Sequence, residues 1–155
     1  GKVHVMVAEI DQKKIDLALS NGADEGILWS RDNTNEENAE LVKKDGEVHA
    51  VLDFIGGPKT MLTGGLCLVR NGKMVVIGLQ GGIVELPLPL LVLKEISLMG
   101  NIVFGLHQMH ELMEFVSKNN ITYPNINYFK LDEANEALDL LEKGQIIGRA
   151  VLKQE

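Results

Sequence analysis

Residues 2–24 read KVHVMVAEIDQKKIDLALSNGAD, which is the pattern of a buried strand followed by a helix. The near-continuous apolar run Val3–Ala8 predicts a strand that is buried on both faces of a parallel sheet. Glu9 follows this run directly, so an acidic side chain stands where the strand would leave the sheet. These residues therefore predict the first strand of a parallel α/β sheet.

The residues after Glu9 predict a helix and then a second strand. Asp11 can cap a helix whose apolar side chains recur at helical spacing, and Asn21-Gly22 supplies the left-handed residue that ends it. Gly26–Trp29 then predicts a second short strand. In a dinucleotide-binding sheet, the acid at such a strand end binds the adenosine ribose. The order strand, acid, helix, strand therefore leads to the hypothesis that this region binds a nucleotide and that Glu9 binds its ribose.

The rest of the chain repeats this alternation. Pro58 suits the first residue of a helix that we expect Asn71-Gly72 to stop, and Asp132 can cap another that Gly144 ends. The resulting fold class is α/β, a Rossmann-like doubly wound parallel sheet that is incomplete at its N-terminal side, in one domain of residues 1–155. The further strands are predicted at Val48–Ile55, Lys73–Leu79, Glu95–Val103, Asn125–Lys130 and Ile147–Lys153, and the further helices at Glu36–Lys44, Pro58–Val69, Leu90–Lys94, His107–Lys118 and Asp132–Lys143.

Composition excludes several classes of partner. The formal net charge is −7, which argues against a nucleic-acid partner because acidic surfaces release no counterions from phosphate backbones. The apolar stretch Leu86–Val103 is interrupted by prolines and charged residues, so we expect no membrane partner. Cys67 is the single cysteine; we expect it to be a small buried side chain in a helix, and its isolation favours a reducing, cytoplasmic location.

Five blocks of sequence lie in order along nearly the whole chain: VAEIDQKKIDLALSNGAD (7–24), VLDFIGGPKTM (51–61), NGKMVVIGLQGG (71–82), SLMGNIVFG (97–105) and LDEANEALDLLEKGQIIGRAVL (131–152). Together these blocks are similar to the cofactor-binding domain of zinc-type alcohol dehydrogenases, which belong to the medium-chain dehydrogenase/reductase superfamily. The resemblance implies an NAD(H)-dependent oxidoreductase that moves a hydride between nicotinamide and an alcohol or aldehyde in the complete enzyme, or a close quinone-reductase-like relative.

Two parts of that family's pattern do not occur in this chain. One is the first strand with its G-x-G-x-x-G turn, which receives the pyrophosphate. The other is the N-terminal, GroES-like catalytic domain, so zinc is expected only there and we expect no catalytic residue here. The chain resembles roughly the last two-fifths of a dehydrogenase, judged by usual domain sizes. Without that first strand, which lies in the middle of the sheet, the backbone edges of Val3–Ala8 and Val48–Phe54 would be unpaired. Either these two strands pair directly, or another polypeptide supplies the middle strand, or the chain is a fragment of something longer. We expect the fragment.

The resemblance also implies roles for charged residues. Glu9 would accept both adenosine ribose hydroxyls and repel a 2′-phosphate, which favours NAD over NADP. Lys14 matches a family lysine beside the adenosine, and Arg149 matches an arginine that reaches the pyrophosphate. From the residues alone, each is equally explained as a solvated surface charge.

Two strand ends consist of an apolar residue followed by glycine, namely Ile55-Gly56 and Ile77-Gly78. Such ends line the ligand crevice of open α/β sheets, although ordinary strand-to-turn geometry would give the same residues. By resemblance, Phe54 and Ile55 flank the adenine and ribose side. The carbonyl of Ile77 would meet the nicotinamide carboxamide, together with backbone at Asn101 and Val103.

Other candidate groups have less specific patterns. His107 and His110, with Glu111 and Glu114, have the spacing of a helical metal site but lack a second converging element, so we expect them to be solvated and expect no metal site. In the resembling family the segment Ile83–Leu93 pairs across a two-fold axis, which implies a homo-oligomer, although a loop packed on its own sheet is an alternative. A non-catalytic oligomerisation or structural module, or a Rossmann-like domain for another adenosine ligand, remain alternative functions.

Overall fold

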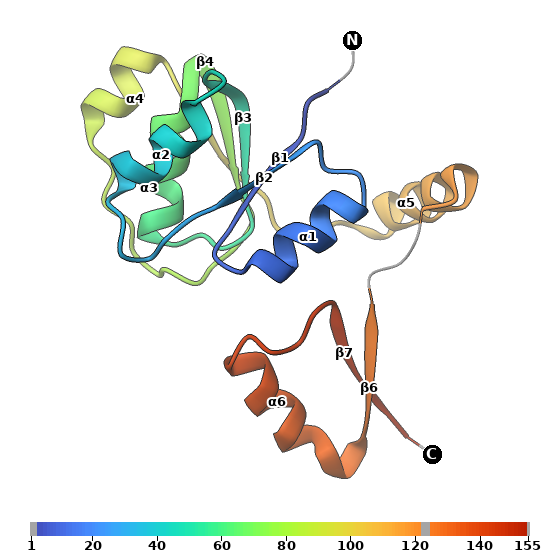
Figure 1. The fold of residues 1–155 in the computed structure, drawn as a ribbon. Helices are drawn as coiled ribbons and strands as arrows, with labels where there is room; N and C mark the ends of the chain where they lie inside the picture. Colours follow the sequence, from blue (N-terminus) through green and yellow to red (C-terminus); the bar gives the residue numbers. More distant parts are fainter. Residues whose placement is uncertain (1–2, 122–124, 155) are drawn as a thin grey trace. The chain divides into compact units, whose positions relative to one another are not determined.

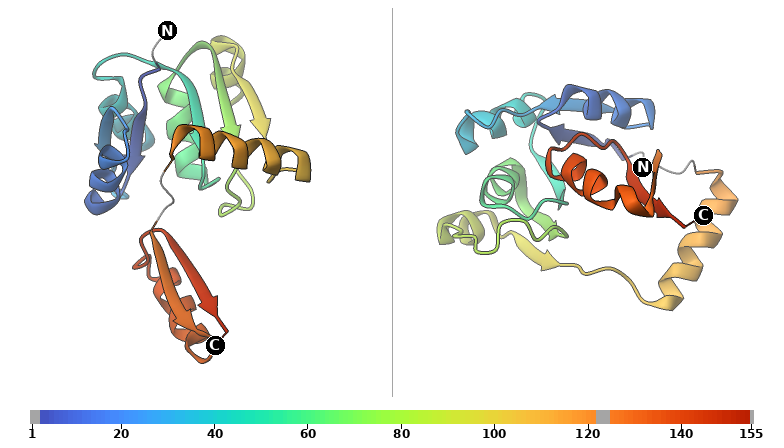
Figure 2. Two further views of the ribbon diagram at one scale, coloured as in Figure 1. Left: turned by 90° about the vertical axis from the view of Figure 1, so that its right-hand side faces the viewer. Right: turned by 90° about the horizontal axis from the view of Figure 1, so that it is seen from below.

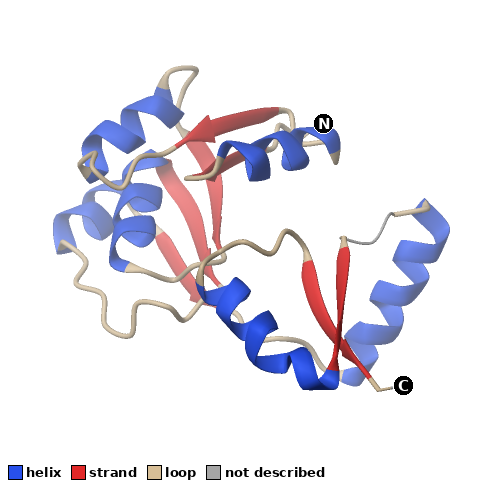
Figure 3. Cartoon of the chain, turned by 60° about the horizontal axis from the view of Figure 1, so that its bottom comes forward, coloured by secondary structure: helices blue, strands red, loops and turns tan. Residues whose placement is uncertain are grey.

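The computed structural model describes residues 3–121 and 125–154, and its chain forms two compact units, Gly1–Val103 and Phe104–Glu155 (Figure 1). Strands and helices alternate through both units (Figure 3). The first unit contains β1 (Met6–Glu9), α1 (Gln12–Ser20), β2 (Glu25–Leu28), α2 (Asn35–Lys43), β3 (Val48–Asp53), α3 (Pro58–Cys67), β4 (Leu68–Val76), α4 (Leu88–Lys94) and β5 (Ser97–Gly100). The second contains α5 (Leu106–Asn119), β6 (Ile126–Lys130), a 3₁₀ turn (Leu131–Glu133), α6 (Ala134–Glu142) and β7 (Arg149–Lys153).

The strands pair in parallel, as the sequence predicts. In the described residues of the first unit, β1 pairs with β2, and β3, β4 and β5 form a second sheet in that order. The helices pack along these strands (Figure 2). The α/β fold class is therefore confirmed. Of the three alternatives for the central edges, direct pairing is wrong, since β1 and β3 belong to separate sheets in the described part of the chain.

The β1–α1–β2 unit forms for the local reasons that the sequence predicts. The carboxylate of Asp11 accepts a hydrogen bond from the N–H of Lys13 at 2.9 Å, which satisfies a free donor at the start of α1. Gly22, with φ of +101°, follows the helix end. A Cβ on Gly26 would lie 2.2 Å from the side chain of Ile15, so this glycine lets α1 pack closely against β2.

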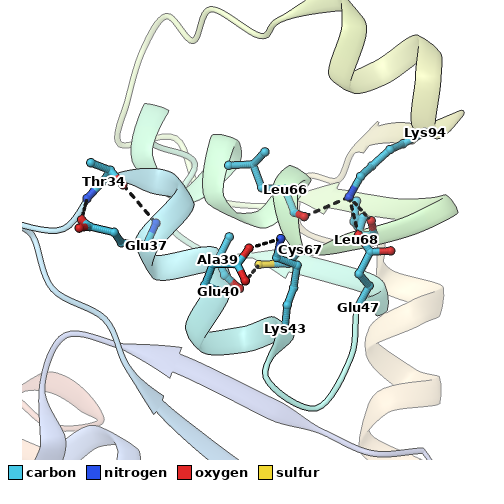
Figure 4. Close-up of polar contacts among 10 residues, drawn as sticks. All are labelled: Thr34, Glu37, Ala39, Glu40, Lys43, Glu47, Leu66, Cys67, Leu68 and Lys94. Atoms are coloured by element: carbon cyan, nitrogen blue, oxygen red, sulfur yellow. Dashed lines mark hydrogen bonds and ion pairs between the residues drawn. The ribbon is translucent and has the colours of Figure 1, made fainter.

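The end of α3 differs from the prediction. The helix ends at Cys67 and the chain continues directly into β4, in which Asn71 and Gly72 form an irregularity of the pairing with β3. The predicted stop at Asn71-Gly72 is therefore wrong. The reason is a distant side chain: the Lys94 ammonium donates to the carbonyls of Leu66 and Leu68, at 3.0 and 2.6 Å, and so satisfies the helix end (Figure 4).

The apolar core of the first unit lies between its helices and strands, in two clusters. Cys67, only 2% exposed, belongs to one of them, and burial raises the pKa of its thiol to about 11. The thiol therefore stays protonated at neutral pH, which confirms that Cys67 is a small buried side chain. The clusters are Ile27, Ala39, Val42 and Cys67, and Met61, Leu68 and Met74.

The second unit carries less of a core. Among its described residues, Ala137 is the buried apolar side chain. β6 and β7 pair in parallel. Asp132 lies inside the 3₁₀ turn that follows β6, and the residue that precedes α6 is Glu133, so the prediction that Asp132 caps this helix is wrong. Gly144, with φ of +66°, follows α6 as predicted. In the described parts of both units, every helix is too short or too polar to cross a bilayer.

Candidate functional site

The carboxyl end of β3 is built around a buried carboxylate, Asp53, which is 5% exposed. One of its oxygens accepts hydrogen bonds from the backbone N–H groups of Ile55 and Gly56, both at 2.9 Å. The other accepts from the hydroxyl of Thr60 on α3 at 2.8 Å, and that hydroxyl in turn accepts from the N–H of Gly57 at 3.1 Å. Asp53 therefore holds the turn Phe54–Gly57 against the start of α3.

The turn after β4 is joined to the turn after β3 by backbone hydrogen bonds. The carbonyl of Asp53 accepts from the N–H groups of Ile77 and Gly78 at 2.8 and 3.1 Å. In return, Gln80 and Gly81 donate to the carbonyls of Ile55 and Gly56, both at 2.9 Å. We call the two joined turns, Phe54–Gly57 and Ile77–Gly81, the rim.

The rim needs glycine where its two turns touch. Gly56 has φ of +68°, and a Cβ there would lie 1.9 Å from the carbonyl oxygen of Gly78. A Cβ on Gly78 would lie 2.2 Å from the backbone of Ile55. No side chain fits at either contact, so the backbones of the two strand ends are in direct contact.

The rim also exposes apolar side chains. Phe54 is 68% exposed and Ile55 is 46% exposed, although both follow a strand whose last residue is buried. Exposed aromatic and aliphatic side chains at the carboxyl ends of parallel strands are the usual lining of a ligand crevice in this class of sheet.

Glu9, the last residue of β1, is placed at a strand end as the sequence predicts. Its side chain is half-buried, and its carboxylate accepts a hydrogen bond from the N–H of the following residue, Ile10, at 2.8 Å. In the part of the chain that the structure describes, no ion pair is formed by Glu9. The carboxylate therefore keeps acceptor capacity for a ligand.

The other predicted residues are distributed over both units. Lys14 is half-buried in α1. Asn101 follows β5 and its N–H donates to the carbonyl of Val76 at 2.9 Å, which ties this backbone to β4. Val103, 75% exposed with φ of +25°, is the last residue of the first unit. Arg149 is exposed at the start of β7 in the second unit, so its approach to the first unit stays a prediction.

Two further features are a cavity in the first unit and the histidines of α5 in the second. A cavity of about 400 Å³ lies beside the starts of α2 and α3 and is lined in part by Lys59 and Glu36. The ammonium of Lys59 donates to the carbonyls of Arg31 and Asn33, so its charge serves the loop before α2. Across the described residues, no group of three or more His, Cys, Asp or Glu side chains is arranged to hold a metal ion. His107 is exposed to solvent and lies 3.7 Å from Glu111.

Sequence reasoning missed Asp53 and Thr60, which the structure makes the centre of the rim. A signal was present: Asp53 is the one acid in its strand, and it is followed by Gly56-Gly57 and by a threonine in the first turn of a helix. Asp followed by glycines is typical of a turn in which the carboxylate accepts from the backbone.

Parallel strands alternating with helices, and a glycine-rich rim at the carboxyl ends of the strands, define the open α/β class of ligand-binding domains. Comparison with known proteins narrows this class. Residues 1–118 match the family model described as zinc-binding dehydrogenase. The chain belongs to this family, whose domain occurs in medium-chain alcohol dehydrogenases.

Individual relatives agree. The chain is 31% identical over 153 residues to an alcohol dehydrogenase of Geobacillus stearothermophilus and 30% identical over 148 residues to an NAD-dependent alcohol dehydrogenase of Saccharolobus solfataricus. These matches cover 97% and 96% of this chain but 43% and 42% of the relatives, so the chain spans less than half of their length. The crystal structure of the Aeropyrum pernix alcohol dehydrogenase matches with a TM-score of 0.84 and 29% identity over 97% of this chain and 42% of that chain.

Proposed function

We propose that this chain is the part of an NAD(H)-dependent alcohol dehydrogenase that binds the adenosine half of the cofactor. The observation that carries the proposal is Glu9, an acceptor without an ion-pair partner in the described residues, at the end of a parallel strand. A carboxylate there accepts the two ribose hydroxyls and repels a 2′-phosphate, so NAD is preferred to NADP. Lys14 lies one turn of helix beyond the cap of α1 and would stand beside the adenosine.

The residues of the rim fit the rest of the adenosine half. Phe54 and Ile55 offer exposed apolar surface to the adenine, and Gly56 lies in the turn that carries them. On the nicotinamide side, the Ile77 carbonyl and the backbone at Gly78, Asn101 and Val103 would orient the carboxamide. Arg149 would make a bidentate contact with the pyrophosphate.

In the complete enzyme, the bound nicotinamide would exchange a hydride with an alcohol or aldehyde, and zinc held by other residues would polarise the substrate oxygen. Among the side chains that the structure describes, no group of three or more His, Cys, Asp or Glu could hold a metal ion. The contribution that we propose for this chain is to bind and orient the cofactor. NAD-dependent alcohol dehydrogenases among its relatives support this assignment.

Calorimetry with NADH and NADPH tests the proposal. The chain has no G-x-G-x-x-G turn for the pyrophosphate, so we expect a dissociation constant on the order of 0.1–1 mM for NADH and weaker binding of NADPH. Equal binding of the two cofactors would contradict the role of Glu9. Low-micromolar binding of NADH would contradict the expectation that a chain without this turn binds the cofactor weakly.

Exposed apolar residues on α4 support a homo-oligomer as a second role. Leu88, Val92 and Leu93 are 67–74% exposed, and they lie within or beside the predicted contact segment Ile83–Leu93. Several large apolar side chains exposed on one short helix are typical of subunit contacts. Light scattering should report a dimer for the chain and a monomer for Leu93→Glu. A monomeric parent chain would contradict this role. Dimerisation of a chain that binds no nucleotide would favour the alternative of a non-catalytic oligomerisation module.

A further inference from the structure

Asp53 is a buried carboxylate for which neither the proposed cofactor contacts nor the family comparison provides a role. Its three hydrogen bonds use both oxygens, and each partner belongs to the turn after β3 or to the first turn of α3. Buried carboxylates are costly unless they are fully hydrogen-bonded. The three hydrogen bonds of Asp53 offset this cost, and an apolar residue here would leave the N–H groups of Ile55 and Gly56 without this acceptor.

The hydrogen bonds fix a conformation that packing alone does not fix. Phe54 and Ile55 are exposed, so no apolar burial holds the turn. Gly56 has a left-handed backbone and no side chain, which leaves the turn with more conformational freedom than other residues would allow. The Asp53 carboxylate restricts this freedom, because the two N–H groups that donate to it belong to Gly56 and to the preceding residue, Ile55.

The same residue also fixes the second turn. The backbone carbonyl of Asp53 accepts hydrogen bonds from the N–H groups of Ile77 and Gly78. The carboxylate also orients the carbonyls of Ile55 and Gly56, which accept from the N–H groups of Gln80 and Gly81. A change in the first turn must therefore move the second, since a Cβ on Gly56 or Gly78 would overlap the backbone of the other turn.

We propose that Asp53 is the positioning residue of the rim: its carboxylate holds the Phe54–Gly57 turn, and through it the Ile77–Gly81 turn, in the conformation that receives the dinucleotide. The inference rests on the proposed function for the ligand, but the mechanical part is independent of it. The carboxylate acts through the backbone and touches no cofactor atom. It also lies at the start of α3, so an internal anion already occupies the neighbourhood of that helix N-terminus.

Amide hydrogen exchange on the full chain tests the mechanical part. In Asp53→Ala, we expect the amides of Ile55 and Gly56 to exchange about 100-fold faster, and those of Gln80 and Gly81 about 10-fold faster, because the first pair loses its acceptor and the second loses its fixed partners. The Ile15 amide, which donates to Asp11 in α1, should keep its rate. Unchanged rates at Gln80 and Gly81 in a folded variant would overturn the proposal.

Conservative variants separate positioning from general stability. Asp53→Asn keeps an oxygen for Ile55 and Gly56, so its exchange rates and its NADH affinity should stay within about threefold of those of the parent, whereas Asp53→Ala should lose about 10-fold in NADH affinity. Asp45→Asn, an exposed acid before β3, serves as the matched control and should change neither quantity. Failure of asparagine to rescue the turn would contradict positioning by hydrogen bonds.

If Asp53→Ala does not fold, Thr60→Val decides the question. It removes only the hydroxyl that bonds to Asp53 and Gly57, and we expect about 10-fold faster exchange at Gly56 and Gly57 with normal exchange in α1. Unchanged rates at both amides would overturn the proposal. If the parent chain does not respond to NADH at all, the proposed function fails, while the exchange rates still decide whether Asp53 holds the rim.

Discussion

The carboxyl ends of β1 and β3 carry the same chemical group in two different environments. Asp53 is 5% exposed and both of its carboxylate oxygens accept hydrogen bonds from the protein. Glu9 is half-buried and accepts from the N–H of Ile10. Both acids end a parallel strand, and the sequence pattern singled out Glu9 alone. The difference teaches that an acid at a strand end must be judged by whether the protein already uses its acceptors.

The contrast has a consequence for mutation. Changes at the Asp53 end should lower stability because they disturb contacts within the protein. Changes at the Glu9 end should leave stability intact and lower affinity for the cofactor. A variant that violated this division would weaken the assignment of Glu9 to the ligand.

The largest effect is expected at Gly56. In Gly56→Ala, the new Cβ would meet the carbonyl oxygen of Gly78 at 1.9 Å, and the residue would also hold a left-handed backbone, so we expect a loss of at least about 3 kcal/mol in the free energy of unfolding. Urea denaturation measures it. Gly82→Ala is the matched control: Gly82 has φ of +65° with no atom within 4 Å of its Cβ position, so only the backbone term of about 1 kcal/mol remains. Equal losses in both variants would disprove contact between the two turns.

A smaller effect, on binding rather than stability, is expected at Glu9. Glu9→Gln should change the free energy of unfolding by less than about 0.5 kcal/mol and weaken NADH binding about 10-fold, because a neutral amide replaces charge-assisted hydrogen bonds to the ribose. Calorimetry and urea denaturation give the two quantities. Glu25→Gln, also half-buried but at the opposite end of the same strand pair, should leave both unchanged. If both variants lost a similar factor in NADH affinity, the net charge of the chain, and not the Glu9 carboxylate in particular, would account for the loss.

The sequence predicted the features that depend on neighbouring residues. The Asp11 cap and the end of α1 at Asn21-Gly22 follow from patterns within one helix and its flanks. Cys67 was also predicted to be buried, because an isolated cysteine in an apolar helix has few other roles.

The features that depend on distant residues were not predicted. The end of α3 is set by Lys94, which lies 26 residues beyond Leu68, so no local stop signal marks it and Asn71-Gly72 was misinterpreted. Lys94 also bonds to Glu47 at 2.9 Å, and this hydrogen bond lowers the pKa of the Glu47 carboxyl (Figure 4). In the same way, the two turns of the rim bring together residues more than twenty positions apart in the sequence. Gly56 and Gly78 must both be glycine because each packs against the backbone of the other turn, and no local pattern shows this contact.

The most direct test follows the amide signals of the isotopically labelled chain by two-dimensional NMR while NADH is added to millimolar concentration. Our account predicts shifts at Ile10, in the turn Ile55–Gly57 and at Ile77 and Gly78, with a midpoint weaker than low micromolar. Shifts confined to the cavity beside Lys59, to the second unit, or to no residue at all would contradict the assignment of the nucleotide to the ends of β1, β3 and β4.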